Sequence, residues 1–75
     1  MNDLIVRFQN TIMTMLQNEL LTQEEFEILA NLSENIQDKT VLELISRITA
    51  DNFKDRDIID CILEKQYKTA LEIIG

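Results

Sequence analysis

The segment Leu20–Phe26 (LLTQEEF) constrains the fold more than any other part of the chain. Thr22 and Glu25 have the spacing of a capping box, in which each side chain binds a backbone N–H group that the first turn of a helix leaves unpaired. Leu21 and Phe26 have the spacing of a hydrophobic staple, which fixes the angle at which the chain enters a helix. The segment therefore predicts a corner where one helix ends and the next begins.

The composition predicts an all-α protein. The chain has 75 residues, of which 45% are hydrophobic, and it contains no proline and a single glycine. That share of apolar residues is normal for a globular protein and too high for a disordered one. A chain with so few helix breakers and many Leu, Ile, Glu and Lys residues is usually helical. We therefore expect one domain over residues 1–75, a compact bundle of four to five short amphipathic helices.

The first two predicted helices flank the corner. In residues 3–20 an apolar side chain recurs at every fourth position, which is the spacing of a helix face that packs on a core; these side chains are Leu4, Phe8, Ile12, Leu16 and Leu20. The opposite face of this segment is polar but nearly uncharged. The second helix is expected to run from Gln23 to about Ser33, and the weak helix formers at 33–35 predict a turn after it.

The second half of the chain predicts two or three further helices. A third helix, capped by Asp38 or by Thr40, is expected to end near Thr49, and Phe53 is expected to pack on the core from the following loop. From residue 55 to residue 74 the apolar positions keep helical spacing throughout. The pattern fits either one helix of roughly twenty residues or two helices broken near Lys65 and Gln66.

The residue types available make catalysis and cofactor binding unexpected. The chain has no histidine, so it lacks the usual general base at neutral pH and the commonest zinc ligand. Cys61 is its only cysteine and Gly75 its only glycine, which leaves no disulfide, no zinc site within one chain and no glycine-rich phosphate loop. The aspartates of residues 51–60 do not have the spacing of a calcium-binding loop. We predict a non-enzymatic protein without cofactor or metal.

The charge of the chain argues for a protein partner. It carries 14 acidic and 7 basic residues, a net charge of −7. Nucleic acids and anionic membranes need clustered Lys and Arg, so we expect no direct binding to either. No basic segment followed by an apolar run opens the sequence and no stretch has the length of a membrane span, which predicts a cytoplasmic protein.

The acidic residues are concentrated in the first half of the chain. Residues 1–37 contain six acids and only one base, Arg7. The candidate partner-binding carboxylates in this half are Glu19, Glu24, Glu27 and Glu34. Three hypotheses follow: an adaptor or regulator that binds a protein through an acidic and polar helical face, a small acidic inhibitor of viral or plasmid type that occupies a basic nucleic-acid-binding surface of a host protein, or a homodimer that buries the Met13/Met15 side of the first helix.

Three segments resemble the caspase recruitment domain, a death-fold family of helical bundles. They are Glu19–Leu29 (ELLTQEEFEIL), Gln37–Ile45 (QDKTVLELI) and Ile59–Gly75 (IDCILEKQYKTALEIIG). In that family a helix ends in leucine, and a Thr or Ser caps the short acidic helix that follows. The chain departs from the pattern because it is shorter by about one helix at its N-terminus.

The resemblance implies a non-catalytic adaptor that pairs with similar domains, an acidic patch on one copy meeting a basic patch on another. By position, Glu24 and Glu27 would then lie on the acidic side, and Lys39 and Arg47 on the basic side. Homotypic self-association is the corresponding expectation.

Overall fold

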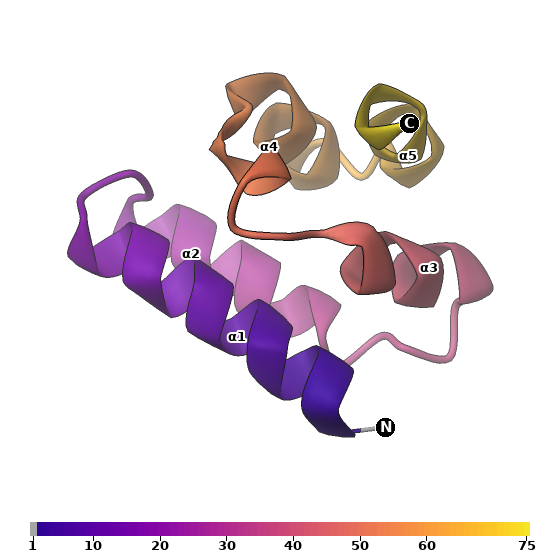
Figure 1. Ribbon diagram of the computed structural model, residues 1–75, viewed down its shortest axis with the longest axis horizontal. Helices are drawn as coiled ribbons and strands as arrows, with labels where there is room; N and C mark the ends of the chain where they lie inside the picture. Colours follow the sequence, from indigo (N-terminus) through magenta and orange to yellow (C-terminus); the bar gives the residue numbers. More distant parts are fainter. Residues whose placement is uncertain (1) are drawn as a thin grey trace.

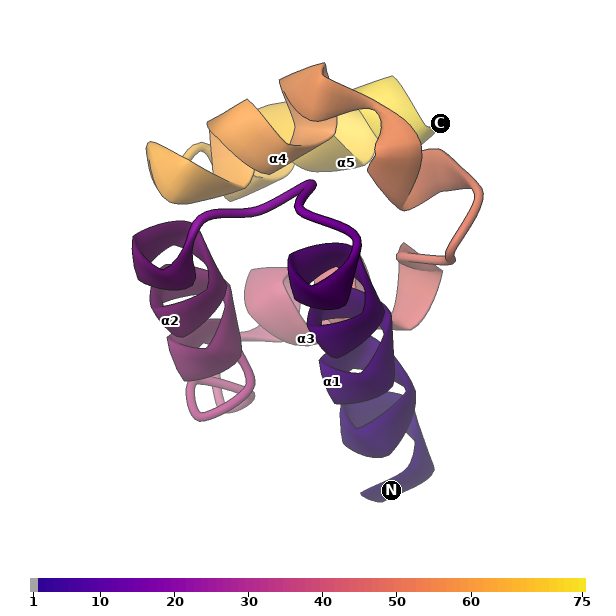
Figure 2. The same cartoon turned by 90° about the vertical axis from the view of Figure 1, so that its left-hand side faces the viewer.

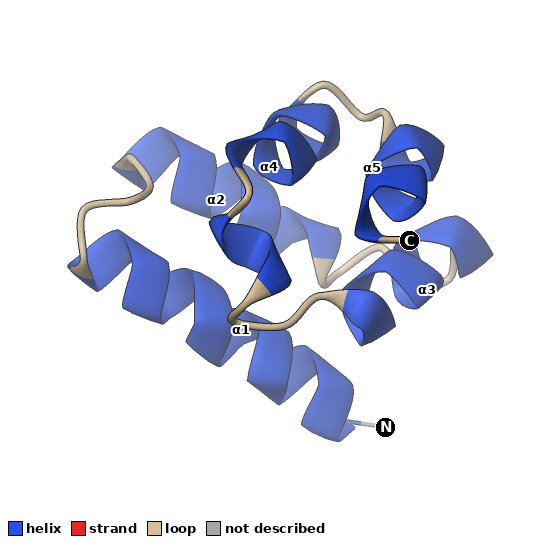
Figure 3. Cartoon of the chain, turned by 45° about the horizontal axis from the view of Figure 1, so that its top comes forward, coloured by secondary structure: helices blue, strands red, loops and turns tan. Residues whose placement is uncertain are grey.

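Five α-helices and one turn of 3₁₀ helix make up the regular structure of residues 2–75, the range that the computed structural model describes (Figures 1 and 3). In chain order these elements are α1 (Asn2–Gln17), α2 (Gln23–Leu32), α3 (Lys39–Arg47), the 3₁₀ turn η1 (Asn52–Lys54), α4 (Arg56–Leu63) and α5 (Tyr67–Ile74). No strand occurs in this range. The prediction of an all-α bundle of four to five short helices is confirmed.

The helices form two pairs that are joined by α3. Helices α1 and α2 lie side by side, and α4 and α5 lie across them, as Figure 2 shows. Helix α3 contacts both α1 and α5, and α2 also contacts α4, so the two pairs form a single globule of 29 × 25 × 21 Å.

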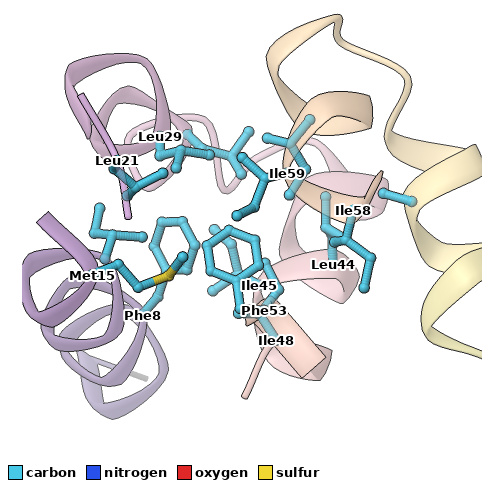
Figure 4. Close-up of a cluster of buried hydrophobic side chains, with 14 of the residues drawn as sticks. Phe8, Met15, Leu21, Leu29, Leu44, Ile45, Ile48, Phe53, Ile58 and Ile59 are labelled. Carbon is cyan, nitrogen blue, oxygen red and sulfur yellow. The ribbon is translucent and has the colours of Figure 1, made fainter. Parts of the chain in front are cut away.

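The core lies where these helices meet, and it is built around two phenylalanines (Figure 4). The rings of Phe8 on α1 and Phe53 on η1 have centroids 6.2 Å apart and planes inclined by 54°, an arrangement favourable for aromatic pairs. Both side chains are essentially inaccessible to solvent. The prediction that Phe53 packs on the core from outside the main helices is therefore confirmed.

Helix α1 ends three residues earlier than the apolar repeat predicts. Glu19 adopts a left-handed conformation with φ of 62°. The N–H of Glu19 donates to the carbonyl of Leu16 (3.1 Å) and that of Leu20 to the carbonyl of Met15 (2.9 Å), the two hydrogen bonds of a Schellman motif. The chain thus turns away before Leu20, whose side chain is 52% exposed, and Leu21 takes the buried position instead. The prediction that residues 3–20 form one helix is wrong at this end.

The capping box after this turn is confirmed. Thr22 Oγ1 accepts a hydrogen bond from the N–H of Glu25, and Glu25 Oε1 accepts one from the N–H of Thr22, both at 3.1 Å. Leu21 is buried and Phe26 packs against the core, as a hydrophobic staple requires.

Helix α3 is capped by Asp38 rather than Thr40. Asp38 Oδ1 accepts hydrogen bonds from the N–H groups of Thr40 (2.8 Å) and Val41 (3.4 Å), whereas Thr40 lies inside the helix. At the other end of α3, the Arg7 guanidinium on α1 donates to the carbonyl of Ser46 (2.8 Å), an exposed acceptor that the last turn leaves unpaired. This contact joins α1 to α3.

Residues 55–74 form two helices, which decides between the alternatives left open by the sequence. Lys65 is left-handed with φ of 63°. The N–H of Lys65 donates to the carbonyl of Ile62 (3.0 Å) and that of Gln66 to the carbonyl of Cys61 (2.7 Å), a second Schellman motif. Helix α5 begins directly after this turn.

Candidate protein-interaction surface

The exposed face of α2 combines two carboxylates with an apolar side chain. Glu24 and Glu27 are exposed, and Ile28, four residues after Glu24 and so its neighbour on the helix surface, is 42% exposed. Asn31 is also exposed, one turn beyond Glu27. We call Glu24, Glu27, Ile28 and Asn31 the α2 face.

The carboxylates of the α2 face are not neutralised by the protein itself. Within residues 2–75 neither Glu24 nor Glu27 has a cationic group within 4 Å, and Glu27 accepts only a hydrogen bond from Gln23 Nε2 (3.3 Å). Glu25 differs, because it forms an ion pair with Arg56 of α4. The Arg56 guanidinium, and then the N–H of Thr22, hold the pKa of Glu25 below its ordinary value, while Glu25 raises the pKa of Arg56.

The other two predicted carboxylates lie beyond the ends of α2. Glu19 is the left-handed residue of the corner before the helix, and Glu34 lies in the turn after it. Ten residues of helix span about 15 Å, so Glu24 and Glu34 are at opposite ends of α2. The structure therefore brings Glu24 and Glu27 together and leaves Glu19 and Glu34 at the flanks.

The predicted basic residues do not form a patch with each other. Lys39 is the first residue of α3 and Arg47 is the last, about 12 Å along the helix. Arg47 Nη2 lies 3.6 Å from Glu43 Oε2, an exposed pair that offsets part of its charge. Lys39 is exposed.

A groove of about 490 Å³ runs beside the α2 face. Ile28 and Asn31 form one of its walls, and Lys65 and Tyr67 of the α4–α5 corner form the opposite wall. Neither Ile28 nor Tyr67 is among the partner-binding residues that the sequence predicts. The one available signal for Ile28 is that it falls beside the apolar stripe of α2 rather than within it, whereas the facing wall is created by tertiary folding alone.

Cys61, the one thiol of the chain, is a poor nucleophile. Cys61 is partly buried, and burial followed by the nearby carboxylates, Glu64 first, raises the pKa of its thiol, so the nucleophilic thiolate is disfavoured. In the described part of the chain no three His, Cys, Asp or Glu side chains are grouped so as to hold a metal ion. Likewise, none of the helices of residues 2–75 combines the length and the apolar character needed to cross a membrane.

No family model matches the chain, and neither a curated protein nor a solved structure matches it. The chemistry of its own surfaces is therefore the basis for its proposed function.

Proposed function

We propose that this protein is a non-enzymatic interaction module that binds a basic segment of a protein partner through the α2 face. The observation that carries the proposal is the exposure of Ile28 beside Glu24 and Glu27, two carboxylates without a cationic partner in the described range. An apolar centre with a polar rim is the usual composition of a protein–protein interface.

The charge of the molecule supports a basic partner. Unpaired carboxylates on a protein with a net charge of −7 attract cationic surfaces over long distances and accelerate their association. The groove beside Ile28 has a volume in the range of natural binding pockets, so it can take up an apolar side chain of the partner. Lysine or arginine side chains next to that anchor would pair with Glu24 and Glu27.

Two kinds of partner satisfy this chemistry. The first is a similar domain, as the resemblance to the caspase recruitment domain implies, in which Lys39 and Arg47 of one copy would face Glu24 and Glu27 of another. The second is the basic nucleic-acid-binding surface of a host protein, which the module would occupy as an inhibitor. Self-association that weakens with salt, measured by light scattering, would identify the first, and competition with DNA or RNA would identify the second.

The proposal is tested by titrating the ¹⁵N-labelled protein with a capped peptide that alternates lysine with leucine. We expect the amide signals of Glu24, Glu27, Ile28 and Asn31 to shift. The E24K/E27K variant should bind this peptide about tenfold more weakly, because two attractive contacts become repulsive.

The matched control is E43K/E72K, which changes the charge by the same amount on α3 and α5. It should bind the lysine–leucine peptide about as well as the parent protein, and circular dichroism should show unchanged helicity in both variants. Shifts scattered over the molecule, or equal losses in the two variants, would show that net charge rather than the α2 face attracts the peptide.

A further inference from the structure

A second groove lies on the flank of α1 that faces away from α2. On the α2 side of α1, Gln9 Nε2 donates to Ser33 Oγ (3.4 Å), whereas on the other side Arg7 reaches the carbonyl groups at the end of α3. The groove occupies this second side, between α1 and the segment formed by the loop after α3 and η1. Its volume is about 320 Å³. It shares no residue with the α2 face.

Apolar side chains form the floor and part of the walls of this groove. Met15 belongs to the core and exposes only 7% of its surface, so it lies at the base. Leu20, displaced from the core by the Schellman turn, lines the groove with 52% of its surface exposed, and Ala50 contributes from the loop after α3. The volume is at the lower end of the range for binding pockets and suits one or two large apolar side chains.

The charges along this groove have the opposite sign to those of the molecule as a whole. Its lining includes Arg7 and Lys54 but no carboxylate, although acids outnumber bases two to one in the chain. Arg7 is positioned by its hydrogen bonds to the carbonyl groups of Ser46 (2.8 Å) and Ile48 (3.4 Å). Lys54 has no ion-pair partner within residues 2–75.

Apart from Arg7, the polar side chains that α1 and Asn18 contribute to the groove are neutral. Asn10 and Asn18 belong to the lining, and both are exposed. An amide side chain can donate to and accept from a peptide backbone at once, without the desolvation cost of a charge. The outer surface of α1, which is polar but nearly uncharged, is therefore suited to binding a peptide backbone. A helix face that is only solvated normally carries more charged residues.

We propose that this groove docks a segment of a protein partner in which a large apolar side chain is flanked by carboxylates. The apolar side chain would lie over Met15 beside Leu20, and the carboxylates would lie toward Arg7 and Lys54. This docking site goes beyond the proposed function, because it is a separate surface and selects a partner segment of the opposite charge.

The test uses the counterpart of the peptide above, a capped peptide that alternates glutamate with leucine, titrated into the ¹⁵N-labelled protein. We expect shifts at the amides of Asn10, Thr14, Asn18 and Ala50. Lys54→Glu should weaken binding about fivefold, because an attractive rim charge becomes repulsive. Lys68→Glu, the same change of charge on α5, should leave the affinity within twofold.

A second variant tests the apolar part of the site. Thr14 is exposed on α1 and lines the groove, so Thr14→Phe should fill the groove and abolish binding without removing a core contact. Circular dichroism checks that this variant is folded. Absence of shifts around the groove, equal effects of Lys54→Glu and Lys68→Glu, or full binding by folded Thr14→Phe would each overturn the proposal. The lysine–leucine peptide reports on the α2 face, so either site can fail while the other stands.

Discussion

The α1–α2 corner and the α4–α5 corner begin in the same way and end differently. In both, the first helix ends in a Schellman motif with a left-handed residue that is not glycine, Glu19 at φ 62° and Lys65 at φ 63°. At the first corner the next helix starts with the capping box of Thr22. At the second it starts at Tyr67, and Gln66, the capping residue before it, makes no side-chain cap hydrogen bond.

The difference shows that a helix end and a helix start are stabilised by different means in this protein. Both ends rely on backbone hydrogen bonds, which any sequence can make if it tolerates the left-handed residue. The start of α2 relies on side-chain oxygens, whereas α5 is held by packing, with Ala70 fully buried among its neighbours. The first corner should therefore depend on its capping side chain, and the second should not.

The largest expected effect on the free energy of unfolding is the contrast between Leu21, which is buried at the first corner, and Leu20, which is exposed there. Leu21→Ala should lower the free energy of unfolding by about 3 kcal/mol, because it leaves a cavity at a buried site. Leu20→Ala, at a side chain that is half exposed, should lower it by less than about 1 kcal/mol. Urea denaturation followed by circular dichroism measures both. A larger loss of stability for Leu20→Ala than for Leu21→Ala would favour the longer helix that the apolar repeat predicts.

Removing the capping side chain at each corner should give a smaller difference in the free energy of unfolding. Thr22→Ala removes the acceptor for the N–H of Glu25 and should cost about 1 kcal/mol. Gln66→Ala removes no such hydrogen bond and should cost less than about 0.5 kcal/mol. The same urea titrations apply, and equal losses at the two positions would mean that the capping box adds nothing to the first corner.

Glycine at the left-handed positions tests what the two corners share. Glu19→Gly and Lys65→Gly should each raise the free energy of unfolding by up to about 1 kcal/mol, because relief of the left-handed strain exceeds the added entropy of the unfolded chain. Glu27→Gly, inside α2, is the control of opposite sign and should cost about 0.5–1 kcal/mol. Destabilisation by all three substitutions would argue against strain at residues 19 and 65.

These corners also explain how far the sequence could predict the structure. The capping box is encoded in two side chains three positions apart, Thr22 and Glu25, and it was predictable, as were the all-α fold and the burial of Phe53. The end of α1 was not, because the apolar repeat continues through Leu20 while the turn is made by backbone. The break at Lys65 stayed open for the same reason, since no glycine marks it.

The candidate surfaces also combine features that local sequence spacing predicts with features that only the tertiary fold creates. Glu24 and Glu27 lie three residues apart on one helix, so the sequence alone could place them on a common face. The exposure of Ile28 beside a groove, and the meeting of Arg7 with Lys54 along another groove, depend on segments far apart in the chain. Hydrophobic periodicity carries no information on such juxtapositions.

The Glu25 carboxylate takes part in both the first corner and the contact with the α4–α5 pair, so a single protonation affects both. Glu25 closes the capping box of α2 and also binds Arg56 of α4. Its lowered pKa means that the folded state favours the ionised form. The resulting stability is fully present above about pH 4.5, the ordinary pKa of the group, and is lost as the pH falls through the folded-state value.

Uptake of that proton should weaken the start of α2 and the α2–α4 contact together. Glu25→Gln keeps an acceptor for the N–H of Thr22 but cannot pair with Arg56 as an ion, so it should remove up to about 1 kcal/mol of stability at neutral pH and flatten the acid-side decline. Melting temperatures between about pH 3 and 7 measure this. Glu24→Gln, one residue away and without an arginine partner, should keep the steeper decline.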